Sequence, residues 1–238
     1  MGTQVVSGLC TLPGTDCLRV SAFCEGIAMG YISVLYRKSW AISFGTLLMV
    51  SLMAWIGLPY RRPHVLHGFA MQPPRPAADF TLTAHTGERV SLHDFRGKLV
   101  LLYFGYTFCP GICPTTLANV AQVLHQVSTR ANQVQLLMIS VDPERDTSEK
   151  LAAYIPHFHP SFIGLTGSAT EIAAVAPLFG IYYEKQESTN ATSYWVDHSA
   201  TLMVIDRQGI MRLIIPFGTA VQDMATDVAF LLREGPPQ

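Results

Sequence analysis

The sequence predicts an α/β domain with a central mixed sheet, carried behind one N-terminal membrane-spanning helix. The helix is predicted by a charge-free apolar run at residues 40–58. The sheet is predicted by continuous apolar stretches at residues 98–106 and 134–142, which have the length of strands buried on both faces. Helical periodicity follows the first stretch, and a terminal hairpin and helix close the chain.

The apolar run begins and ends with basic residues, at positions 37–38 and 61–62. At about 1.5 Å per residue it reaches roughly 28 Å, the thickness of a bilayer core. It is longer than the apolar part of a signal peptide, and no A-x-A-like cleavage site follows it. We therefore expect an uncleaved anchor over residues 39–60. The basic flanks are balanced, so the charge pattern does not choose the side of the membrane.

The 238 residues are 49% hydrophobic and only 14% charged, an apolar composition for a soluble protein. A net charge of −1 gives no reason to expect nucleic-acid binding. Residues 1–38 read as an N-terminal tail, and our hypothesis is that residues 1–28 are a mistaken translation start or a disordered segment. Five cysteines, three of them before the anchor, do not form the pattern of a disulfide framework.

After the anchor, residues 61–78 are Pro-rich and are expected to form an extended linker. The α/β domain is expected over residues 79–235. Its predicted elements are two short strands within 79–92, a strand at 98–106, a helix at 114–130, a strand at 134–142, a helix at 148–158, a strand at 162–165, a helix at 169–179 ended by Gly180, a hairpin of strands at 199–206 and 210–217, and a helix at 219–233. This order is that of a thioredoxin-like fold.

Two cysteines, Cys109 and Cys113, lie in the loop between the first buried strand and the next helix. Side chains at i and i+4 project to the same side of a helical turn, so the two sulfurs can face one another. The N–H groups at a helix N-terminus stabilise anions, so at least one thiol is expected to have a depressed pKa. Thiolates in such a setting attack disulfides or bind soft metals. Two purely structural cysteines are a weaker reading for a strand-to-helix corner flanked by prolines.

Three residues separate the cysteines, one more than in the C-x-x-C motif of thiol redox proteins. The wider gap allows a disulfide and also gives a metal more room. Three soft or borderline ligands suit Cu(I), whereas structural zinc requires four. His198 is the candidate third ligand, because it stands at the start of the predicted strand 199–206. The other histidines are expected to be solvated: His64, His67, His85, His93, His125, His157 and His159.

A further motif, SVDPERDT, covers residues 140–147 and ends the second buried strand. Asp142 is a residue that could face the cysteine loop or only form a turn, and the pattern leaves both open. Arg145 and Asp146 are read as turn and helix-start residues, with Asp146 or Thr147 as the N-cap of the next helix.

Three separated motifs, FGYTFCPGICPTTL, SVDPERDT and VDHSATLMVID, resemble the Sco/SenC family of copper-binding thioredoxin-fold proteins over residues 76–232. The resemblance implies that Cys109, Cys113 and His198 bind copper as Cu(I), with Cu(II) left open. It implies one N-terminal helix in the inner membrane, with the domain in the bacterial periplasm or the mitochondrial intermembrane space. It also implies as partners the copper-binding subunit of cytochrome c oxidase and a copper donor protein.

One position departs from this pattern, because members of the family often carry an acidic residue where this chain has Gly111. The loss of a carboxylate should make the neighbouring thiolates easier to form.

Two functions fit these residues. The first is a copper-binding assembly factor, which is not an enzyme. The second is a membrane-tethered thiol–disulfide oxidoreductase in which Cys109 and Cys113 form the redox pair. His198 separates the two functions, since only the copper protein needs its imidazole.

Overall fold

The computed structural model describes residues 45–53, 65–187 and 194–234, in a chain that divides into two compact units, Met1–Pro63 and His64–Gln238. In the first unit, residues 45–53 form a helix with exposed side chains. The rest of the expected tail and anchor, at residues 1–38 and 39–60, lies outside the described residues. Among the described helices, none combines the length and the apolar character needed to cross a bilayer.

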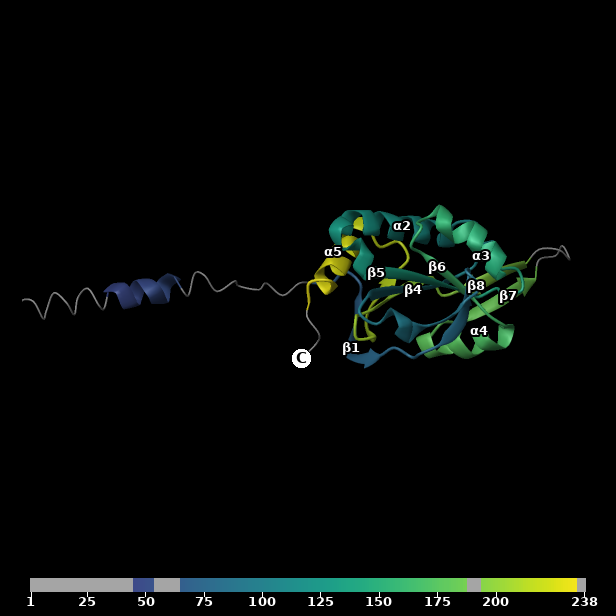
Figure 1. Ribbon diagram of the computed structural model, residues 1–238, viewed down its shortest axis with the longest axis horizontal. Coiled ribbons are helices and arrows are strands. Elements are labelled where there is room, and N and C mark those ends of the chain that lie inside the picture. Colours follow the sequence, from purple (N-terminus) through teal and green to yellow (C-terminus); the bar gives the residue numbers. More distant parts are fainter. Residues whose placement is uncertain (1–44, 54–64, 188–193, 235–238) are drawn as a thin grey trace, which may run out of the picture. The chain divides into compact units, whose positions relative to one another are not determined.

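The second unit is built on an eight-stranded mixed sheet (Figure 1). The three central strands β4, β5 and β6 are parallel, and the remaining pairs are antiparallel. Across the sheet the order is β1 (Phe69–Pro76), β10 (Ile210–Pro216), β9 (Thr201–Ile205), β4 (Leu99–Gly105), β5 (Val134–Ser140), β6 (Ile163–Thr166), β2 (Thr81–Ala84) and β3 (Arg89–Ser91).

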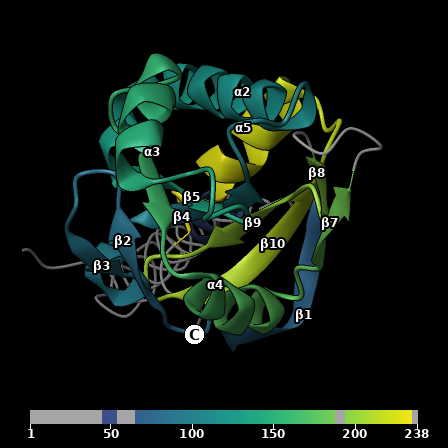
Figure 2. The same cartoon turned by 90° about the vertical axis from the view of Figure 1, so that its right-hand side faces the viewer.

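Helices cover both faces of this sheet (Figure 2). On one face lie α2 (Ile112–Val127), α3 (Ser148–Tyr154) and α5 (Val221–Leu231), and on the other lies α4 (Ala169–Val175). Every residue of β4 and β5 is buried, because both faces of these central strands are covered. The predicted central mixed sheet flanked by helices is therefore confirmed.

The expected helices and strands are present, with shifted ends. The cysteine helix starts at Ile112, two residues earlier than predicted. The helices expected at 148–158 and 169–179 end early and continue as 3-10 turns, Ile155–His157 and Ala176–Phe179. Gly180 adopts the left-handed conformation with φ of 69°, as expected for a residue that ends a helix.

The sequence did not predict strand β1, which falls within the segment expected as a linker at 61–78. This strand pairs with β10 at the edge of the sheet, with a shift of register between Ala70 and Arg75. Prolines are tolerated at such an edge, since one side of the strand needs no ladder hydrogen bonds. The Pro-rich composition therefore concealed a strand, and the compact unit begins at His64 rather than at residue 79.

A second missed element is the hairpin of β7 (Tyr183–Glu187) and β8 (Tyr194–His198), which forms a separate two-stranded sheet. This corrects the predicted setting of His198. The residue ends β8, and β9 begins only at Thr201. In β7 the side chains of Glu184, Lys185 and Gln186 are polar and exposed, so this strand gave no apolar pattern from which it could be predicted.

His67, expected in a solvated tether, is instead bound to the domain. The fully buried carboxylate of Asp227 in α5 accepts hydrogen bonds from the backbone N–H groups of His67 at 2.9 Å and Gly68 at 3.0 Å. The ring Nδ1 of His67 lies 3.0 Å from the same carboxylate. Charge-assisted bonds of this kind fix the start of the domain against its last helix. We call this arrangement the His67–Asp227 clasp.

The clasp should make stability depend on pH. The hydrogen bond to Asp227 raises the pKa of His67 above its usual value of 6.5. A raised pKa in the folded state adds stability that is present below the unfolded pKa and is lost as pH rises through the folded pKa. We expect His67→Ala to lower the free energy of unfolding more at pH 5.5 than at pH 9, measured by urea denaturation. In an Asp227→Asn background this pH dependence should largely disappear, and an equal loss at both pH values would contradict the account.

Candidate metal centre

Both cysteines lie where β4 passes into α2. Cys109 is half-buried in the loop, and Cys113 is fully buried in the first turn of the helix. The backbone N–H of Cys113 donates to the sulfur of Cys109 at 3.4 Å, and the two thiols are within hydrogen-bonding range of each other. Both are free thiols. The spacing thus brings the two sulfurs together as predicted.

Burial decides the chemistry of Cys113. It raises the pKa of this thiol to about 12, against the depression that a helix N-terminus favours. The hydroxyl of Tyr103, a fully buried residue of β4, donates to the sulfur of Cys113 at 3.4 Å. A thiol that keeps its proton is a poor nucleophile, whereas a metal can displace that proton. The accessible Cys109 is therefore the better attacking group of the pair.

Gly105, the last residue of β4, makes room for this pair. A Cβ built on Gly105 would lie 2.6 Å from the ring of Tyr103 and 3.0 Å from the sulfur of Cys113. Real Cβ atoms essentially never lie as close to a neighbour as 2.6 Å, and a distance of 3.0 Å is tighter than most, so a side chain there must displace one of these two groups.

We expect Gly105→Ala to cost about 1–3 kcal/mol of unfolding free energy, because the added methyl overpacks the cysteine corner. The same variant should weaken Cu(I) binding, since the added methyl crowds both the sulfur of Cys113 and the ring of Tyr103, whose hydroxyl donates to that sulfur. Gly111→Ala is the control for copper binding: it adds the same methyl between the cysteines, where nothing lies within 4 Å. Its backbone, at φ −146° and ψ −60°, lies outside the regions that residues with a side chain favour, so the two variants are compared in copper affinity and not in stability. Denaturation measures the stability of Gly105→Ala, and copper titration of both variants measures the difference in affinity. An equal loss of affinity would show that crowding at Cys113 is not the cause.

The backbone of His198 reaches the same edge of the sheet as the cysteine loop. Leu202 of β9 pairs with Tyr103 of β4, so the residues before β9 lie beside the end of β4. The N–H of Val196 in β8 also donates to the hydroxyl of Tyr106 at 3.4 Å. The side chain of His198 lies outside what the structure describes. Among the side chains that it does describe, no three His, Cys, Asp or Glu residues gather closely enough to hold a metal.

An ion pair in the SVDPERDT loop connects the hairpin to the cysteine loop. The fully buried Asp142 accepts a hydrogen bond from the hydroxyl of Tyr194 at 2.6 Å and pairs with Arg145. Arg145 donates to the backbone carbonyl of Tyr194 at 3.2 Å. Its guanidinium lies over the ring of Tyr194 at 3.6 Å and over that of Phe108 at 4.7 Å. Asp142 therefore supports the strand that ends in His198, and Arg145 is more than a turn residue.

Asp146 holds the cysteine loop in place through hydrogen bonds from Thr107. Its buried carboxylate accepts from the N–H of Thr107 at 2.9 Å, the hydroxyl of Thr107 at 2.5 Å and the hydroxyl of Ser140 at 2.7 Å. Burial raises the pKa of Asp146. Of the two predicted N-caps only Thr147 caps α3, by accepting from the N–H of Lys150. Asp146, read as a helix-start residue, instead fixes the loop that carries Cys109.

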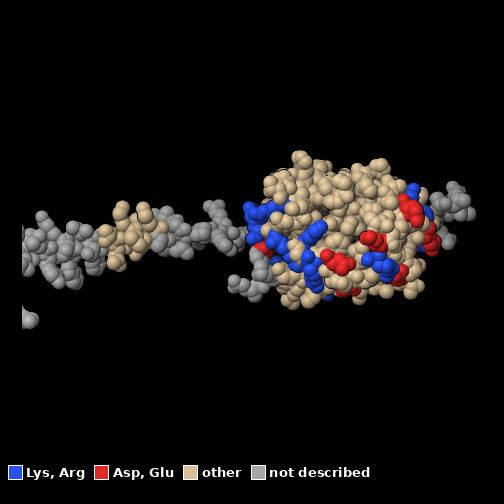
Figure 3. Space-filling view, in the orientation of Figure 1, with Lys and Arg blue, Asp and Glu red and all other residues tan. Residues whose placement is uncertain are grey.

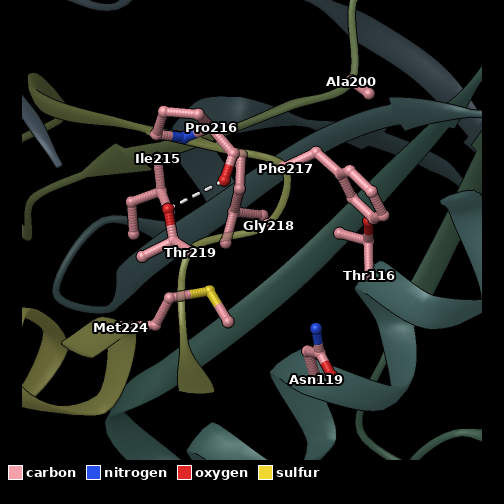
Figure 4. Close-up of a pocket in the computed structure, with 10 residues that line it drawn as sticks. Thr116, Asn119, Ala200, Ile215, Pro216, Phe217, Gly218, Thr219 and Met224 are labelled. Atoms are coloured by element: carbon pink, nitrogen blue, oxygen red, sulfur yellow. Dashed lines mark hydrogen bonds between the residues drawn. The ribbon is translucent and has the colours of Figure 1, made fainter. Parts of the chain in front are cut away.

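An apolar surface surrounds the cysteine pair. Phe108 and Ile112, on either side of Cys109, are 52% and 41% exposed. Beside them a small open pocket runs between α2, the starts of β9 and α5, and the loop after β10 (Figure 4). Phe217 and Thr116 both line this pocket, and the hydroxyl of Thr219 donates to the carbonyl of Pro216 at 2.9 Å. Exposed apolar side chains next to two thiols are suited to contact with another protein.

Comparisons with known proteins identify the family of this chain. The family model described as SCO1/SenC matches residues 70–233. The human "Protein SCO2 homolog, mitochondrial" is 36% identical over 163 residues, covering 66% of this chain and 61% of that protein. The bovine protein of the same name is 43% identical over 134 residues, covering 56% of this chain and 50% of that protein. The chain spans about half the length of the curated relatives it matches.

Solved structures give the same result. Arabidopsis thaliana ScoI with copper bound has a TM-score of 0.62 and 35% identity, covering 66% of this chain and 98% of that one. Bradyrhizobium japonicum ScoI with copper bound has a TM-score of 0.61 and 33% identity, covering 66% and 99%. The solution structure of apo Sco1 from Thermus thermophilus has a TM-score of 0.62 and 37% identity, covering 71% and 97%. The thioredoxin-like α/β class is confirmed, and two of these relatives contain copper.

Proposed function

The chain belongs to the SCO1/SenC family, and on that premise we propose that it is a membrane-anchored copper(I) carrier that assembles the copper centre of cytochrome c oxidase. Cys109 and Cys113 supply two thiolates, and His198 supplies a neutral imidazole. The observation that carries the proposal is the pair of reduced sulfurs at the start of α2, at the sheet edge where β8 ends. Copper in the Arabidopsis and Bradyrhizobium relatives supports it.

The donor atoms suit Cu(I), which is bound by soft thiolates and by imidazole. Copper is the cargo of this protein, and it takes the place of the thiol protons when it binds. The Tyr103 hydroxyl stays within reach of the Cys113 sulfur and can donate to its lone pairs. The half-buried Cys109, at the open side of the pair, is the ligand through which a recipient can begin ligand exchange.

Residues 39–60 serve as a single-pass anchor in this proposal. The domain then lies on the periplasmic side of the inner membrane, or in the mitochondrial intermembrane space. Its partners are a copper donor protein and the copper-binding subunit of the oxidase, which contact the apolar surface around Phe108 and Ile112.

A second activity is favoured by the proximity of the thiols. Cys109 can attack a disulfide in the recipient to form a mixed disulfide, and Cys113 then displaces the recipient. Two thiols of this chain become one disulfide while the recipient's disulfide becomes two thiols, so electrons and protons balance. The same protein could thus reduce the recipient's cysteines before copper is transferred.

X-ray absorption on the copper-loaded protein tests the ligand set. The sample is the full chain in detergent, reduced, with Cys10, Cys17 and Cys24 changed to Ser so that only the domain cysteines remain. The expected copper environment has two sulfur ligands and one nitrogen ligand at one equivalent of Cu(I). Copper bound by sulfur alone, or no stoichiometric copper, would overturn the assignment.

A further inference from the structure

Basic side chains gather at one end of the domain. Figure 3 shows Lys and Arg concentrated over the end where α5 finishes, whereas the two charges are mixed elsewhere on this face. Eleven basic and fifteen acidic residues fall within 65–187 and 194–234. Six of the eleven form what we call the basic end: Arg96, Lys98, Arg130, Arg207, Arg212 and Arg233.

Contacts between distant segments place these residues together. The carbonyl of Leu232, after α5, accepts from Arg130 at 3.4 Å and from Arg207 at 2.8 Å. The N–H of Gly97 donates to the carbonyl of Arg207 at 2.9 Å. The guanidinium of Arg96 lies against Gly209, since a Cβ there would fall 1.5 Å from its Nη1. The starts of β4, β5 and β10 and the last residues of α2 and α5 therefore share one surface.

The positive charge of this end is largely unneutralised. Among the described residues, the ion pairs of the basic end all involve Arg212, which pairs with Asp206 at 3.3 Å and with Glu234 at 2.8 Å. Arg130 and Arg207 donate to uncharged oxygens, and Lys98 donates to the amide oxygen of Gln135 at 3.4 Å. Arg130 and Arg233 also complement the negative ends of α2 and α5. Arg96 and Lys98 lie on the turn before β4, so interaction with a helix end does not explain why these two positions are basic.

The basic end lies opposite the cysteines. Strand β4 begins directly after Lys98 and ends at Gly105, from which the chain enters the cysteine loop. The length of the sheet thus separates the positive surface from the thiols. A binding partner at the basic end leaves the copper ligands free to act on another protein.

We propose that the basic end docks on anionic phospholipid headgroups of the membrane that holds the anchor, and so turns the cysteine loop away from the bilayer. The proposal rests on the proposed anchor at residues 39–60. Clusters of Lys and Arg next to a membrane anchor bind anionic lipid surfaces within about one Debye length. Residues 61–66 can span at most about 20 Å before the His67–Asp227 clasp. The domain is therefore held close enough to the lipid surface for its charge distribution to set its orientation.

Hydrogen exchange on the full chain in lipid nanodiscs tests this docking. We expect amides at residues 128–133 and 206–210 to exchange at least threefold more slowly in discs with 30% phosphatidylglycerol than in phosphatidylcholine discs. Residues 107–112, at the cysteine end, should exchange equally in both. The slowing should disappear in 0.5 M NaCl, because salt screens charges at a lipid surface.

Two charge-matched variants complete the test. Arg96→Gln/Arg130→Gln/Arg233→Gln removes three exposed charges of the basic end and should abolish the lipid dependence. Arg89→Gln/Lys150→Gln/Lys185→Gln removes three exposed charges elsewhere and should keep it. No dependence on anionic lipid, slowing at residues 107–112 instead, or equal behaviour of the two variants would overturn the proposal. Failure of the chain to insert into either disc would instead refute the anchor, and copper binding tests the carrier function separately.

Discussion

His198→Ala is expected to weaken Cu(I) binding by more than about 100-fold while leaving the disulfide between Cys109 and Cys113 able to form. Loss of an outer-shell partner of a metal ligand already costs about 10- to 100-fold in affinity, so loss of a ligand should cost more. The disulfide needs only the two sulfurs, which are set by β4 and α2 and not by the hairpin. A competition titration against a Cu(I) chelator measures the first effect, and thiol titration after oxidation measures the second.

The matched control for this prediction is His125→Ala. His125 is exposed in the last turn of α2, whereas Cys113 lies in the first turn. Its loss should therefore leave the Cu(I) affinity unchanged. An affinity for Cu(I) that is the same in His198→Ala as in His125→Ala would remove His198 from the ligand set. A thiol–disulfide reductase would then be the better account of the cysteine pair.

The central part of the fold could be predicted because local pattern and tertiary role agree there. Strands β4 and β5 are buried on both faces and read as unbroken apolar runs. Strand β1 could not be predicted, since its pairing with β10 depends on a distant segment and its prolines indicate a linker. The hairpin of β7 and β8 could not be predicted for a related reason. Among the described strands, its two strands pair only with each other, and Glu184, Lys185 and Gln186 of β7 are exposed.

The residues of the candidate site likewise include some that could be predicted from the sequence and some that could not. Cys109 and Cys113 could be found because they are rare residues at a recognisable strand-to-helix corner. Gly105 and Tyr103 could not, since an apolar strand with one glycine gives no sign that the glycine faces a sulfur. The role of Arg145 depends on three segments meeting in space, so its motif suggested only a turn.

Arg145→Ala is expected to have the largest effect on stability, about 3–5 kcal/mol of unfolding free energy. The substitution leaves the carboxylate of Asp142 fully buried without its cation, and breaking one half of a buried ion pair costs about this much. The hydroxyl of Tyr194 still donates to Asp142, which limits the loss. Arg145→Lys should recover part of the stability, but not the contacts that a planar guanidinium makes with the rings of Tyr194 and Phe108.

The same substitution should weaken copper binding without touching a proposed ligand. Arg145 connects the hairpin that ends in His198 to the loop that carries Cys109, so its loss should let the two parts of the site move apart. Chelator competition should therefore show lower Cu(I) affinity in Arg145→Ala, at a temperature where the variant is still folded. Lys150→Ala is the control, because Lys150 is the other cation over the ring of Phe108 and forms no ion pair among the described residues. It should leave the free energy of unfolding and the Cu(I) affinity nearly unchanged. If Arg145→Ala were destabilised but bound copper with full affinity, the ion pair would stabilise only the fold. The position of His198 would then not depend on Arg145.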